Sequence, residues 1–281
     1  MHSEFGIFYT VFSLLLVSVY ARIVYVFIKH RKYRDLECYR LMAQIGVVQC
    51  VATAPGFSMY GVALLVGKDY FNIATHLMQL LPVGLRLEAW LSFVLALNRL
   101  KLICELRYPN MVHTVLVVII WAGGAACFAS LFTPCCEFRI VPGNLMAQYN
   151  MSNPSTVVFT KILFYLLYFP TGLTLIVYII ITAFLIRIKF KYSTVSALKE
   201  KSILIYAVTR FMIDLTIGII YFYGNLPHRD LCEFFMTMSY ILNNLFTSPM
   251  LYLIMNRELW SEVFQLTKNN VEVHVLTSVR N

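Results

Sequence analysis

Two long apolar stretches of this sequence contain charged side chains. Arg86 and Glu88 interrupt one stretch, and Arg210 and Asp214 interrupt another. A charge near the centre of a lipid bilayer costs several kcal/mol unless a partner or water compensates for it. The chemistry open to these residues is therefore ion pairing between helices, or the binding of a small cation or a proton.

Depth along the two stretches predicts which charges meet. Arg86 and Asp214 each lie thirteen residues from a basic residue at one end of their own stretch, which corresponds to roughly 20 Å of helix. We therefore predict that Arg86 pairs with Asp214. Arg210 lies one turn from Asp214 and competes for that carboxylate, and it can pair instead with Glu88. Such a pair is either a permanent structural contact or one that breaks when the protein switches state.

The composition requires lipid as the main solvent of the chain. Of 281 residues, 59% are hydrophobic and 13% are charged, whereas soluble domains carry about 25% charged residues. A spanning helix needs about 20 apolar residues, so the chain has room for seven spans with short connections. We predict a single all-α domain of seven transmembrane helices, at 5–28, 38–66, 71–103, 111–132, 157–188, 202–223 and 231–255, followed by a cytoplasmic tail at 256–281.

The tail is expected to begin with a short amphipathic helix. Leu259, Trp260, Val263 and Phe264 recur at the spacing of one helical face. This pattern is typical of a helix that lies on the inner membrane surface.

The basic residues fall mainly on one side of the predicted membrane. Fifteen Lys and Arg residues lie in four segments: 29–37, 99–110, 187–201 and 256–281. The loops on the other side contain three: Lys68, Arg139 and Arg229. Basic loops remain in the cytoplasm, so we expect an external N-terminus and an internal C-terminus in a cell membrane. The glycosylation sequon at Asn150 lies in the longest external loop, in agreement with this orientation.

Two short motifs near the predicted inner membrane face resemble those of a known superfamily. Leu97-Asn98-Arg99-Leu100 and Ser248-Pro249-Met250-Leu251-Tyr252 look like the Asp-Arg-Tyr and Asn-Pro-x-x-Tyr signatures of rhodopsin-like G-protein-coupled receptors. Three further residues fall where that superfamily carries the same types: Trp121, Pro170 and Tyr178. The resemblance covers essentially the whole chain.

Departures from the superfamily pattern narrow the match. The predicted sixth span has no proline, and the outer end of the third has no cysteine, so the usual disulfide to the second external loop cannot form. With Glu37–Met42 opening the second span and Tyr252–Asn256 closing the last, the chain resembles the nematode serpentine chemoreceptors of class T or X. The resemblance implies a sensory receptor that binds an unidentified extracellular ligand and activates a heterotrimeric G protein.

The resemblance also implies roles for residues at the inner face. In the family, the arginine that corresponds to Arg99 meets the G protein, and the tyrosine of the Pro249-x-x-Tyr252 motif closes behind it. Asn98 stands in the acidic position and cannot supply the charge of the acid, so we expect weak restraint of Arg99 and raised basal signalling. Alternatively, Arg99 only anchors the span by its charge. The basic loop at 187–201 can meet either the G protein or anionic membrane lipid.

A second polar layer lies closer to the inner face. Gln49, Glu88 and Asn244 each lie eleven residues from the inner end of their own span, roughly 17 Å deep, with Ser248 one turn below. In rhodopsin-like receptors, the matching positions hold a sodium ion, with the acid on the second helix. Here Gln49 takes that place and Glu88 carries the carboxylate, so the hypothesis is a sodium or proton site centred on Glu88. In the alternative, Arg210 neutralises Glu88 or the carboxylate is protonated. No other cofactor is expected.

Three of the seven cysteines lie on the predicted external side. Cys135 and Cys136 are adjacent in the second external loop, and Cys232 lies at the mouth of the seventh span. One arrangement is a disulfide from one of the pair to Cys232, and the other is free thiols.

Other function classes find less support in the sequence. The chain contains no H-E-x-x-H or G-x-S-x-G motif, so an enzyme is not expected. Most of the basic residues that give the formal charge of +9 lie between apolar stretches, where membrane orientation explains them. Nucleic acid is therefore not an expected partner. A transporter or channel remains an alternative because charges within spans also mark ion paths. A receptor-like accessory protein that no longer signals is another.

Overall fold

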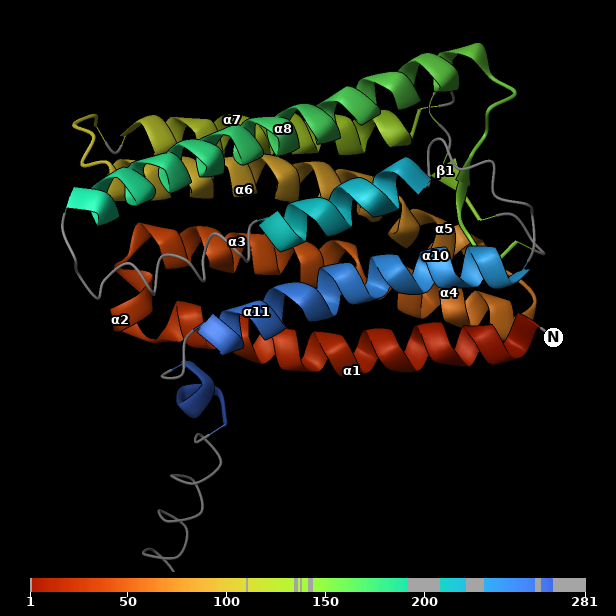
Figure 1. Ribbon diagram of the computed structural model, residues 1–281. Helices are drawn as coiled ribbons and strands as arrows, with labels where there is room; N and C mark the ends of the chain where they lie inside the picture. The colour runs from red at the N-terminus through yellow and green to blue at the C-terminus, as the bar shows by residue number, and fades with distance from the viewer. Residues whose placement is uncertain are drawn as a thin grey trace, which may run out of the picture.

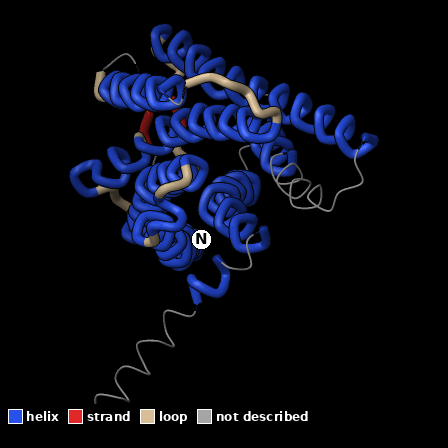
Figure 2. The backbone as a smooth tube through the Cα atoms, turned by 90° about the vertical axis from the view of Figure 1, so that its left-hand side faces the viewer, coloured by secondary structure: helices blue, strands red, loops and turns tan. Residues whose placement is uncertain are grey.

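The computed structural model describes residues 2–109, 111–133, 136, 138–140, 144–191, 208–220, 230–255 and 259–264. Within these ranges, seven helical spans lie side by side (Figure 1), and Figure 2 looks toward one end of the bundle. The spans are α1 (His2–Lys29), α3 (Glu37–Ala52) with α4 (Ala54–Val66), α5 (Ile73–Met78) with α6 (Leu80–Ile103), α7 (Met111–Leu131), α8 (Pro154–Lys191), the helix at 208–220, and α10 (Asp230–Leu242) with α11 (Ser248–Met255). The predicted all-α, seven-helix bundle is confirmed.

The helices have the length and the outer surface of membrane spans. Five described helices are long and apolar enough to cross a bilayer, at Ser3–Lys29, Glu37–Val66, Tyr70–Ile103, Met111–Leu131 and Pro154–Arg187. Large apolar side chains on α1, α7 and α8 face outward, with Leu15, Val118 and Tyr165 more than 60% exposed. Such surfaces require lipid contact, so the protein is a multi-pass membrane protein.

Three of the predicted spans contain a break, each with a local cause. The second span divides at Thr53, because Pro55 has no backbone N–H to donate. The third begins with a 3₁₀ turn at Tyr70–Asn72, and α5 and α6 meet at Gln79, just before Pro82. In the seventh, a π-helical turn at Asn243–Thr247 joins α10 to α11. The prediction of single continuous helices missed these breaks.

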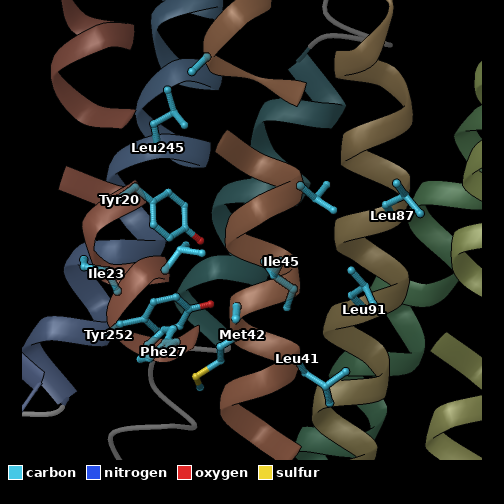
Figure 3. Packing of buried hydrophobic residues seen from close by; sticks show 14 of the residues in the cluster. Tyr20, Ile23, Phe27, Leu41, Met42, Ile45, Leu87, Leu91, Leu245 and Tyr252 are labelled. Carbon is cyan, nitrogen blue, oxygen red and sulfur yellow. The ribbon is translucent and has the colours of Figure 1, made fainter. Parts of the chain in front are cut away.

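One half of the bundle is packed with large side chains from four spans. Figure 3 shows Tyr20, Ile23 and Phe27 of α1 facing the last span, with residues of α3 and α6 completing the cluster. Tyr20, Ile23 and Leu91 are fully buried. This core fixes the relative rotation of α1, α3, α6 and α11, and so determines which polar side chains point inward.

A two-stranded antiparallel sheet covers the opposite end of the bundle. Strands β1 (Phe138–Arg139) and β2 (Gln148–Tyr149) belong to the long loop between α7 and α8. Leu145 in this loop is fully buried, and its carbonyl accepts hydrogen bonds from the Tyr9 hydroxyl (3.2 Å) and the Thr237 hydroxyl (2.9 Å). Its N–H donates to a carboxylate oxygen of Glu233 at 2.7 Å, so the loop is attached to α1 and α10.

The predicted amphipathic face of the helical residues 259–264 is only partly buried. Leu259 and Val263 are buried, whereas Trp260 and Phe264 are about half exposed and their ring centroids lie 4.7 Å apart. The Nε–H of Arg22 in α1 donates to the Val263 carbonyl at 2.7 Å. One part of the face therefore packs on the bundle, and the aromatic pair remains available to the membrane surface.

The contact of α1 with α4 depends on two glycines. A Cβ atom added to Gly61 would lie 2.5 Å from the Gly6 carbonyl oxygen and 2.9 Å from the Thr10 nitrogen, so the backbones themselves would have to separate. We expect Gly61→Val to destabilise the protein by about 2 kcal/mol through overpacking. The measurement is the thermal midpoint of the purified protein in detergent.

Gly123→Val in α7 is the matched control, because a Cβ atom at Gly123 meets nothing within 4 Å. Equal midpoints for the two variants would show that the α1–α4 contact is not as tight as described.

Candidate functional site

The Arg210 guanidinium lies at the centre of a buried polar network. Its Nη2 donates to Glu88 of α6, and its Nε donates to Asp214, one turn along the same helix, at 3.2 Å. Its Nη1 donates to the Ser248 hydroxyl of α11 at 3.0 Å and to the Asn243 carbonyl. The side chains of Arg210 and Glu88 are 9% and 10% exposed, whereas that of Asp214 is 37% exposed. One cation thus connects the third, sixth and seventh spans.

The π-helical turn brings the seventh span into this network. A π turn shifts backbone hydrogen bonding to an i→i+5 pattern and widens the helix locally. Asn243 and Asn244 are both buried there, although they are adjacent in the sequence. Asn243 uses its carbonyl for Arg210 and its side-chain amide for the Asp214 carboxylate, at 2.5 Å. Its two polar groups therefore hold both members of the Arg210–Asp214 pair.

The network continues to the first and second spans. The Tyr20 hydroxyl donates to Gln49 Oε1 at 2.5 Å, and Gln49 Nε2 donates to the Ser248 hydroxyl at 3.4 Å. Gln49 and Ser248 are each 1% exposed. Five spans therefore share one continuous set of polar contacts.

The predicted pairing of Arg86 with Asp214 is wrong. Arg86 donates from Nη1 to the Pro82 carbonyl at 2.6 Å and from Nε to the Leu163 carbonyl of α8 at 3.2 Å. Asp214 is bound instead by Arg210, the competing partner recognised from the sequence, which also binds Glu88. Equal depth is necessary for a contact between helices, but the direction of each side chain around its helix axis decides it.

The residues of the hypothesised sodium site do not fit a sodium ion in this conformation. The Arg210 guanidinium already donates to Glu88 and Ser248 and so supplies the positive charge that the ion would bring. Asn244 turns its amide to the Tyr240 carbonyl of its own span, at 2.8 Å. Among the described residues, no group of three His, Cys, Asp or Glu side chains could hold a metal ion. The alternative reading, in which Arg210 neutralises Glu88, describes the geometry.

A second polar cluster lies at the end of the bundle that is predicted to be cytoplasmic. Asn98 of α6 donates from Nδ2 to Glu37 Oε2 of α3 at 2.7 Å, and Glu37 Oε1 lies 2.9 Å from Nδ1 of His113 in α7. The Tyr108 hydroxyl lies 2.8 Å from His113 Nε2, and burial and the Glu37 carboxylate raise the pKa of this phenol. The protonated phenol can therefore donate to the imidazole. A carboxylate of the second span therefore lies next to Asn98.

The other motif residues lie around this end of the bundle. The Arg99 Nε atom is buried and has no hydrogen-bond partner. Tyr252 is 4% exposed and packs against Phe27 of α1, with ring centroids 5.9 Å apart. Pro249 follows Ser248 in the first turn of α11.

The predicted external sites have different outcomes. Cys136 is disulfide-bonded, whereas Cys232 is a free cysteine, so the predicted bridge to Cys232 does not form and not all the thiols are free. Cys135 lies outside the described residues. Asn150 lies in the loop after β2, where its side-chain oxygen accepts the Ser152 N–H at 3.3 Å. Its glycosylation stays a prediction.

Two adjoining cavities lie within the bundle. The first, of about 90 Å³, is bordered by Glu88, Arg210 and Asp214, and extends between α6, α8 and the helix at 208–220. The second, of about 50 Å³, lies beneath the sheet of the external loop and is lined by Arg86 and Tyr149. Leu85, Leu167 and Tyr240 border both cavities. Space for a small molecule therefore lies directly beside the Arg210 network.

Several polar residues of these sites were missed by sequence reasoning. Asn243, Tyr20 and His113 belong to no motif, so nothing marked them among other polar residues of apolar spans. The adjacent pair Asn243-Asn244 inside an apolar span was the available signal, because a regular helix cannot easily direct two neighbouring amides inward.

Glu88 and Asp214 should contribute unequally to stability. Glu88→Gln removes the more buried partner of Arg210 and should cost about 3 kcal/mol, because a buried ion loses its compensation. Asp214→Asn removes a more exposed carboxylate, so solvent screens the change and the loss should be smaller. Thermal midpoints of both variants in detergent measure the difference. A lower midpoint for Asp214→Asn than for Glu88→Gln would contradict the described burial.

No protein-family model and no curated protein matches this sequence. The fold, in contrast, matches 162 chains of solved structures. Squid rhodopsin is among them, with a TM-score of 0.69 over 96% of this chain and 86% of that chain, at 9% sequence identity. At this identity the similarity concerns the fold alone. The chain therefore has the seven-helix fold of rhodopsin.

Proposed function

We propose that this protein is a G-protein-coupled receptor that converts binding of an external ligand into rearrangement of its helices, and that it serves chemical sensing as the serpentine chemoreceptors do. One observation carries the proposal: a single buried cation links the third, sixth and seventh spans beside a cavity. A contact of this kind can hold one state and break in another, which is what a switch requires.

Three features support this direction of signalling. The distribution of Lys and Arg favours an external N-terminus, so the covered end of the bundle, with β1 and β2, faces the ligand. The motif arginine Arg99 lies near the opposite end, where a heterotrimeric G protein would bind. The rhodopsin fold and the order of the degenerate motifs agree with a receptor more than with a transporter.

The Glu37–Asn98 hydrogen bond modifies the expectation of weak restraint. The side chain of Asn98 donates a hydrogen bond to the Glu37 carboxylate of α3. A negative charge therefore lies beside the motif although Asn98 itself is neutral. We propose that Glu37 partly replaces the missing acid of the motif in the resting state.

Arg99→Ala tests the coupling role. We expect it to abolish G-protein activation because it removes the cation that would contact the G protein. The measurement is a G-protein reporter in cells exposed to a panel of ligands, with surface labelling of the receptor in the same cells.

Arg31→Ala is the matched control, because Arg31 is a basic residue of the same predicted side and its side chain is 86% exposed. Full signalling by Arg99→Ala at equal surface expression would contradict a receptor that couples through this motif. Substrate-dependent current or flux in cells without G proteins would favour a transporter instead.

Breaking the central network should activate the receptor without ligand. Arg210→Gln removes the cation shared by Glu88, Asp214 and Ser248, so the sixth span loses its ion pair with the third span and its hydrogen bonds from Arg210 to the seventh. We expect basal reporter activity per surface receptor to rise by about tenfold, the effect of roughly 1.4 kcal/mol on a two-state equilibrium.

The control for this experiment is Lys161→Gln, which neutralises an exposed basic residue of α8. The milder variant Asp214→Asn should produce a smaller rise. Unchanged basal activity in both network variants, at normal surface expression, would show that the network is a permanent structural contact.

A further inference from the structure

Arg86 carries the buried charge that the central network leaves without a counter-ion. The residue is 8% exposed, and its guanidinium donates to two backbone carbonyls, those of Pro82 and Leu163. Within the described ranges, no carboxylate lies within ion-pair distance of it, and its Nη2 makes no hydrogen bond. A guanidinium cannot lose its proton in a protein, so this charge persists at every physiological pH.

The two buried arginines differ in the number of carboxylates that bind them. Arg210 binds two carboxylates, whereas Arg86 binds none. The excess negative charge near Arg210 can be removed by protonation of a carboxyl group. The charge of Arg86 has no such solution, and an isolated buried cation is costly. Among the described residues, no carboxylate compensates this charge.

The space beside Arg86 contains a second unsatisfied polar group. Tyr149 of β2 lines the same cavity, and its buried hydroxyl lies beside the Arg86 guanidinium but donates its own proton to no acceptor among the described residues. Burial raises the pKa of this phenol, and the neighbouring Arg86 guanidinium partly offsets the effect, so the two groups lie close together. The other walls are mainly apolar, with Phe57, Leu81 and Phe138 among them. Two donors, one of them charged, thus face an apolar cavity beneath the external loop.

From this arrangement we infer that the cavity is a binding site for a small aliphatic carboxylate, with its head group on Arg86 Nη2 and the Tyr149 hydroxyl. A planar guanidinium is the preferred partner of a carboxylate because two N–H groups can meet the two oxygens. A phenol can donate a further hydrogen bond to the same head group. The proposal rests on the proposed function in treating the cavity as the ligand site of a receptor.

The dimensions of the cavities set the size of the ligand. The cavity beside Arg86, of about 50 Å³, holds three to five water-sized groups at roughly 10–15 Å³ for each, which is enough for a carboxylate and one or two carbons. Leu85, Leu167 and Tyr240 also border the larger cavity beside the Arg210 network. An aliphatic chain of a few further carbons can extend there and would contact the groups that join the sixth span to the third.

The test uses hexanoate as the probe, with hexanol and hexylamine as probes of the same chain length. The thermal midpoint of the purified full-length protein is measured in detergent over a range of probe concentrations. Hexanoate should raise the midpoint with increasing concentration, because a ligand that binds the folded state stabilises it. Hexanol and hexylamine should have little effect, since neither offers a negative head group.

Two variants assign the effect to the site. Arg86→Gln should weaken the apparent hexanoate affinity by about tenfold or more, and Tyr149→Phe by about fivefold, as expected for a charged and a neutral hydrogen bond. Lys161→Gln, on the exposed side of α8, should leave the affinity unchanged. Tyr149→Phe removes one oxygen atom and keeps the ring, so it tests the site even if Arg86→Gln does not fold.

Equal stabilisation by hexanol, or an unchanged hexanoate affinity in Tyr149→Phe, would overturn the proposal. The measurement needs no G protein, so it separates the two ideas. A protein that binds hexanoate through Arg86 but activates no G protein would contradict the receptor proposal and leave the carboxylate site intact. A protein that activates a G protein but does not bind hexanoate would contradict the carboxylate site and leave the receptor proposal intact.

Discussion

The Arg210 guanidinium must satisfy two carboxylates and a backbone carbonyl at once, and this constraint organises the spans around it. Glu88 approaches from α6, Asp214 from the same helix, and Asn243 and Ser248 from the last span. Each partner has a low exposure except Asp214, which borders the cavity. In a low-dielectric interior, none of these groups can move alone without leaving another unsatisfied. Movement of the sixth span is therefore coupled to the third and the seventh.

Much of the fold was accessible from the sequence because lipid imposes simple rules on it. Apolar length predicted the seven spans, since every backbone polar group in a bilayer must be satisfied within a helix. The breaks at Thr53 and Gln79 were within reach as well, because Pro55 and Pro82 mark them. The π-helical turn was not, because its cost is compensated by Arg210 and Asp214, which are distant in the sequence.

Only part of the site could be predicted from the sequence, and the reason is geometric. Helical rise estimates the depth of a residue. Gln49, Glu88 and Ser248, which it placed at similar depths, belong to the Arg210 network, whereas Asn244 bonds within its own span. Helical rise gives no information on rotation around the axis of each helix, which depends on the packing of the whole core, and this is why Arg86 was paired wrongly. The cluster of Glu37, Asn98 and His113 depends on three helix ends meeting, which one sequence does not encode in any local pattern.

The loop between α7 and α8 is held against the bundle by hydrogen bonds. Tyr9, Thr237 and Glu233 all bind the backbone of Leu145, and Tyr60 binds the neighbouring carbonyl of Asn144 at 2.7 Å. These bonds tie α1, α4 and α10 to one short segment of the loop, so the three helices cannot spread apart at this end of the bundle unless some of the bonds break.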